Sequence, residues 1–180
     1  RRDQFITSTT TTPMTSTTIN TKKVPGRPKL TFTTLEQAIA HAQHLADLDR
    51  ANRLEQLGNW PLGQAMGHLA WWANAAFDGF PPELNPPMPI RVIARLTRGP
   101  FLAMRMPAGV NLPKAPGGTF GIAPMSTDQG LAALQSAFQR VIAQCPPRPS
   151  PLLGHLSHDQ WKKLHCRHSE LHLSFFKERN

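Results

Sequence analysis

The stretch from Gln64 to Phe77 constrains the fold more than any other part of this chain. It carries almost no charge on any side when its residues are placed on a helix. A helix that is apolar all round belongs in the centre of a bundle, since a surface helix keeps a polar face toward water. Pro61 fits the first turn of such a helix, and Asn59 is the expected N-cap. The sequence therefore predicts a central helix that other helices surround.

Four further helical segments are predicted around this central helix. They cover about residues 35–57, 90–104, 128–144 and 158–177, with a kink in the second of them near Gly99-Pro100. Expected caps are Thr33 or Thr34 for the first, Ser126 and Thr127 for the third, and Ser157 for the last. Nothing from residue 34 to 180 has the pattern of a strand. The predicted fold class is therefore an all-α helical bundle.

The composition divides the chain into a tail and one domain. The 180 residues carry a net charge of +9, and residues 1–33 hold six basic residues against Asp3 alone. Because this region is rich in Ser and Thr and poor in apolar residues, we expect residues 1–33 to be disordered and residues 34–180 to form the bundle domain. No apolar run is long enough to span a membrane, and the charge outside the tail is spread out, so a nucleic-acid partner is not favoured. A homodimer is compatible with the sequence.

Three of the eight histidines fall on one side of the last predicted helix. His165, His168 and His172 lie within a sector of roughly 60° on a helical wheel. Arg167, Glu170 and Ser174 lie on the opposite side, which we expect to face outward. Imidazoles that point into a core need partners for their ring nitrogens, since water is scarce there. This grouping indicates a functional site.

A divalent metal ion is the partner that these histidines favour. His168 and His172 have the i, i+4 spacing that lets two imidazoles converge on one ion. His68, in the middle of the apolar central helix, has no charged neighbour within a turn and supplies a third candidate. His165 is an alternative ligand. Gln64, one turn before His68, is a candidate for orienting an imidazole or a substrate.

Two segments around these histidines carry a resemblance to a known family. They are Asn59 to Ala70, which contains Trp-x-x-x-Gln-x-x-x-His-Leu-Ala, and His165 to Leu173, which contains Arg-His-x-x-x-His-Leu. Together they resemble a branch of unknown function of the DinB/YfiT-like superfamily, over residues 34–177. The resemblance implies a four-helix bundle with a long crossover, a bacterial-type cytoplasmic protein, and a divalent ion (zinc, nickel, manganese or iron) bound by His68, His168 and His172.

The chain departs from this family just after the last histidine. Many relatives carry Arg and Gln there, whereas this chain has Ser174 and Phe175. Any substrate contact made by that polar pair is therefore in doubt here, while the three histidines remain.

Two functions from different classes follow from these features. The first is a metal-dependent enzyme that acts on a small molecule. Thiol transfer is favoured over hydrolysis because no carboxylate is an obvious base: Glu170 is expected on the outer face, and Asp78 is far from His68. Asp47 or Asp49 of the first predicted helix could reach the site, and periodicity does not decide this. Members of the family act as such transferases, and a low-molecular-weight thiol is the expected substrate. The second function is a non-catalytic binding or regulatory bundle whose basic tail contacts nucleic acid or another anionic partner.

Overall fold

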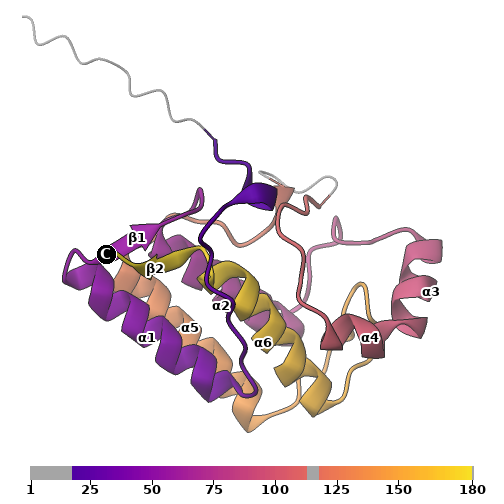
Figure 1. Ribbon diagram of the computed structural model, residues 1–180. Coiled ribbons are helices and arrows are strands. Elements are labelled where there is room, and N and C mark those ends of the chain that lie inside the picture. Colours follow the sequence, from indigo (N-terminus) through magenta and orange to yellow (C-terminus); the bar gives the residue numbers. More distant parts are fainter. Residues whose placement is uncertain (1–17, 113–117, 180) are drawn as a thin grey trace, which may run out of the picture.

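Four long helices form a bundle in the computed structural model, which describes residues 18–112 and 118–179 (Figure 1). They are α1 (Leu35–Arg50), α2 (Leu62–Asp78), α5 (Thr127–Ala143) and α6 (His158–Leu173). Two shorter helices, α3 (Met88–Leu96) and α4 (Arg98–Ala103), lie in the long connection between α2 and α5. The prediction of an all-α bundle with a long crossover is confirmed. None of the helices in the described ranges is long and apolar enough to cross a membrane.

The helix starts follow the capping residues in the sequence. Ser126 and Ser157 each form a complete capping box with the glutamine three residues later, and the Thr34 side chain accepts a hydrogen bond from the Gln37 N–H. The expected cap at Asn59 is wrong. Pro61 occupies the N-cap position of α2, and the Asn59 side chain instead bonds both the N–H and the carbonyl of Ile19.

Two predicted helices are shorter than their apolar patterns indicated. The first ends at Arg50 because the chain turns at Asn52, which has a left-handed φ of 55°. The residues that follow form β1 (Leu54–Gln56), which pairs antiparallel with β2 (Phe176–Glu178). The last helix accordingly ends at Leu173 instead of near residue 177. This pairing joins segments at opposite ends of the domain, so no local pattern signals it.

Two glycines bring α2 and α5 into close contact. A Cβ built on Gly130 of α5 would lie 2.3 Å from the carbonyl oxygen of Gly63 on α2, and one on Gly63 would meet the Ser126 carbonyl at the same distance. Only glycine fits at such a backbone contact. The contact fixes α2, which is buried along nearly its whole length, against α5 on one side and leaves its other side to α6.

The chain before α1 is packed against the bundle. From a short 3₁₀ helix, η1 (Thr21–Lys23), it runs extended along α6 to the start of α1 (Figure 1). Phe32 is 6% exposed, and its N–H donates to the Glu170 carboxylate at 2.6 Å. The expectation of disorder is therefore wrong for residues 18–33, because a few anchoring side chains order a segment whose average composition is polar. Residues 1–17 lie outside the described residues.

The two crossover helices differ in how they meet the body. Leu102 of α4 is buried in a small second core with Leu153, Leu156 and Trp161. In contrast, α3 buries no residue completely, and most of its large apolar side chains are exposed.

Candidate metal centre

Three histidines from two helices meet inside the bundle. His68 comes from the middle of α2, and His168 and His172 come from successive turns of α6. One ring nitrogen from each lies within 4.8 Å of the others. The Nε2 atoms of His68 and His168 are 3.2 Å apart. The structure thus brings together the three histidines that the resemblance implied as ligands.

The hydrogen bond to His68 fixes the position of its proton. Its Nδ1 lies 2.7 Å from the carbonyl oxygen of Phe120, which can only accept, so Nδ1 carries the hydrogen. The Nε2 lone pair is then free and is directed at the His168 imidazole. A backbone carbonyl behind the imidazole is the usual arrangement for a metal-ligating histidine.

Burial keeps the three imidazoles neutral. It lowers the pKa of His68 to about 4 and lowers the pKa values of His168 and His172 well below the ordinary range. Their mutual repulsion when charged lowers the pKa of the two α6 histidines further. Neutral imidazole is the form that binds a metal ion, so protons do not compete for this site at neutral pH.

The spacing of the nitrogens also suits an ion. Tetrahedral ligands at a typical zinc–nitrogen distance are about 3.3 Å apart, close to the 3.2 Å between His68 and His168. Without an ion, three neutral imidazoles can share few hydrogen bonds, since each offers one donor and one acceptor. The donor set therefore fits a divalent metal.

Gln64 acts on the site through a loop. Its Nε2 donates to the carbonyl of Ile122 at 2.8 Å. The same loop supplies the Phe120 carbonyl that bonds His68. Gln64 therefore holds the loop that orients an imidazole, whereas the sequence suggested that its amide would bond the imidazole or a substrate itself.

His165 lies outside the group of three. It is buried, its ring stacks on Trp161 at 5.7 Å between centroids, and its Nε2 has no hydrogen-bond partner among the described residues. Burial lowers its pKa to about 4. The structure does not bring it together with the three other nitrogens, which disfavours its role as an alternative ligand.

Two tryptophans surround the histidines. Trp60 stacks on His172, with the rings 6° from parallel and their centroids 5.4 Å apart, and Trp72 packs in a T-shaped arrangement with both His68 and His168. The sequence analysis did not identify Trp60 as part of the site. Its only signal was its position one residue before Pro61, in the motif that resembles the DinB branch.

The histidines lie in the wall of a large cavity of about 1450 Å³. Its lining is mainly apolar and aromatic and includes Trp60, Trp72, Phe80 and Phe101. Glu83 is the only acidic residue among the described lining residues, and it is exposed in the loop after α2. The cavity can hold an organic molecule next to the three imidazoles but offers it few charged groups.

Glu170 does not face outward as expected. It is 5% exposed, because the extended segment before α1 covers this side of α6. Its carboxylate pairs with Arg167 and accepts from the Phe32 N–H. It is therefore committed to packing and is absent from the lining of the histidine cavity.

An arginine from the same segment lies where the chain departs from the family pattern. The Arg27 guanidinium donates to Ser174 Oγ at 2.6 Å and lies over the Phe175 ring, 3.7 Å from its centroid. Its positive charge is near enough to His172 to lower the pKa of that imidazole. The sequence analysis missed Arg27 because it was assigned to the disordered tail.

The comparisons with known proteins identify a family without a described activity. The profile of a family described as "Protein of unknown function (DUF1569)" matches residues 26–179. This match spans most of the chain, including the segment that carries Arg27 and all three clustered histidines, and the chain belongs to that family. No curated protein and no solved structure matches the chain significantly.

Proposed function

We propose that this protein is a metal-dependent enzyme in which His68, His168 and His172 hold one divalent ion at the wall of the large cavity. The observation that carries the proposal is the convergence of three neutral imidazole nitrogens in a mostly apolar cavity. Membership of the DinB/YfiT-like superfamily, suggested by the two sequence motifs, is part of this proposal and is consistent with the bundle.

The donor set limits the ion and its chemistry. Imidazole nitrogens suit first-row transition metals, so zinc, nickel, manganese and iron all remain candidates. Three protein ligands leave at least one position open, which is the pattern of a catalytic site. When bound, the ion would act as a Lewis acid that lowers the pKa of a thiol or of water.

Thiol transfer is the reaction class that the surrounding residues favour. Hydrolysis usually needs a carboxylate to accept a proton, and Glu83 is the only acidic residue among the described lining residues. A thiol needs less help from a base to lose its proton, since its own pKa is already near 8.5. In this proposal Phe120 and Gln64 keep His68 in position, while Trp60 and Trp72 exclude water and contact the apolar part of the substrate.

Metal analysis of the purified protein tests the metal site. We expect about one divalent ion per chain in the wild type, and loss of stoichiometric metal in His168→Ala, because two imidazoles bind an ion far more weakly than three. His155→Ala is the matched control, since His155 is exposed and lies outside the cavity. A wild-type protein without bound metal, or a His168→Ala protein with undiminished metal, would contradict the proposal.

Product analysis tests the reaction class. The metal-loaded protein is incubated with an electrophilic chloronitrobenzene in the presence and absence of cysteine, and separately with a nitrophenyl ester. A thioether product that needs both the metal and cysteine supports thiol transfer. Ester cleavage without any thioether would instead indicate a hydrolase.

A further inference from the structure

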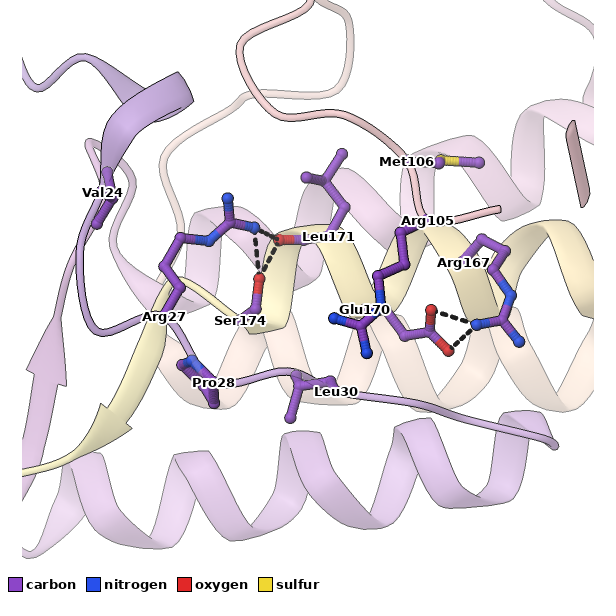
Figure 2. A pocket seen from close by; sticks show the side chains of 10 residues that line it. All are labelled: Val24, Arg27, Pro28, Leu30, Arg105, Met106, Arg167, Glu170, Leu171 and Ser174. Atoms are coloured by element: carbon purple, nitrogen blue, oxygen red, sulfur yellow. Dashed lines mark hydrogen bonds and ion pairs between the residues drawn. The ribbon is translucent and has the colours of Figure 1, made fainter. Parts of the chain in front are cut away.

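A second, smaller cavity lies on the side of α6 away from the histidines. It has a volume of about 260 Å³ and is lined by three arginines that come from three separate parts of the chain (Figure 2). Arg27 belongs to the extended segment before α1, Arg105 follows α4, and Arg167 lies on α6. Leu171 and Met106 line both this cavity and the histidine cavity, so the two share a wall.

One of the three arginines is fully neutralised by the protein. Arg167 pairs with Glu170 through both carboxylate oxygens, and that carboxylate also accepts from the Phe32 N–H. Figure 2 shows this pair at one end of the cavity. The Glu170 carboxylate is therefore used by Arg167, and the positive charges of Arg27 and Arg105 are left without it.

These two arginines have no acidic partner among the described residues. Arg27 donates to the Leu171 carbonyl and to Ser174 Oγ, which are both uncharged, and Arg105 contacts the Thr31 hydroxyl at 3.3 Å. The Nε atoms of Arg27 and Arg167 are also buried without a hydrogen-bond partner. Partial burial lowers the pKa of Arg27, which reflects the free-energy cost of a cation held away from water without a counter-ion.

We propose that this cavity binds a small anion, the carboxylate or phosphate group of a small molecule, between Arg27 and Arg105. Guanidinium groups bind such oxyanions through two parallel hydrogen bonds and keep their charge when partly buried. The anion would supply the missing negative charge and would connect the extended segment to the loop after α4. The volume of the cavity is sufficient for a free phosphate ion or a short carboxylate.

Calorimetric titration with inorganic phosphate tests this site. Arg105→Gln is the informative variant because Arg105 is exposed and makes a single long hydrogen bond, so the fold does not depend on it. We expect its affinity for phosphate to fall about tenfold or more relative to the wild type, since one charge-assisted contact is lost. Arg95→Gln is the matched control: it removes the same charge from α3, outside the cavity, and should bind phosphate like the wild type.

The source of the anion is distinguished by repeating the titration with succinate in a chloride-matched buffer. Succinate that displaces phosphate supports a site for carboxylates as well, and phosphate binding alone supports a phosphate site. Absence of binding by both ions overturns the proposal, as does an equal loss in Arg95→Gln and Arg105→Gln, which would indicate general attraction to a basic surface. The measurement reads binding and not catalysis, so its outcome is independent of the metal proposal.

Discussion

At the scale of single residues, His68 and His165 show how two buried histidines can differ. Both have a pKa lowered to about 4 by burial. His68 bonds a carbonyl through one nitrogen and directs the other at His168, whereas His165 stacks on Trp161 and leaves Nε2 without a partner among the described residues. Burial alone therefore does not mark a ligand; the direction of the free nitrogen does.

Replacing His165 tests this distinction. We expect His165→Phe to keep the metal content of the wild type, because the three clustered nitrogens are unchanged. At neutral pH its free energy of unfolding should stay equal or rise by up to about 1 kcal/mol, since a buried nitrogen without a partner is removed and the aromatic stack is kept. His172→Phe is the comparison and should lose the metal. Metal analysis and urea unfolding measure both effects; loss of metal in His165→Phe would make this residue a ligand.

Helical periodicity predicted the members of the histidine group but not which of them are ligands, and only the family resemblance implied that division. Helical periodicity places His165, His168 and His172 in one sector, and only the packing of α2 against α6 decides which turn of α6 lies beside His68. The Phe120 carbonyl could not be predicted either, because it comes from a long loop without a regular pattern. A ligand pair at i, i+4 can be predicted from neighbouring residues of the sequence, whereas the hydrogen bonds that support the ligands come from distant residues.

At the scale of elements, the sequence predicted the helices through their caps and apolar patterns and missed the elements that depend on distant contacts. The capping boxes at Ser126 and Ser157 were visible because both partners lie within four residues. The strand pair β1–β2 and the extended segment before α1 are stabilised by contacts across more than a hundred residues. In that segment, Phe32 and Arg27 are too few to change an average composition that is typical of disorder.

The contact between α2 and α5 gives a prediction at this scale. Gly130→Ala should lower the free energy of unfolding by about 2 kcal/mol or more, because the new Cβ would lie 2.3 Å from the Gly63 carbonyl and would push the helices apart. Gly99→Ala, in α4, is the control: apart from its chain neighbours nothing lies within 4 Å of its Cβ, so the change in the free energy of unfolding should stay within about 1 kcal/mol. Urea unfolding measures both, and equal effects would show that the close contact is absent.

At the scale of the whole molecule, the fold places the histidine cluster and the arginine-lined cavity on two sides of α6. α6 presents His168 and His172 to the large cavity and Arg167 to the small one, and Leu171 lies between. The extended segment before α1 completes the small cavity with Arg27. At least one basic residue before α1, Arg27, thus packs against the rest of the domain. The net charge of +9 is therefore weaker support for a partner such as nucleic acid.

The buried histidines predict a strong dependence of stability on pH. His68, His165, His168 and His172 all have lowered pKa values in the folded state, so between about pH 6.5 and pH 4 the unfolded chain binds more protons than the folded one. Stability is then complete above pH 6.5 and is lost as the pH falls toward 4. At pH 5.5 His68 and His165, whose pKa values are about 4, should each cost about 1.4 kcal/mol in the metal-free protein, and His168 and His172 should add to this loss. Urea unfolding with a chelator at pH 7.5 and 5.5 measures this loss, and His165→Phe should show a loss smaller by one histidine's share. Equal stability at the two pH values would mean that these imidazoles are not buried in the neutral form.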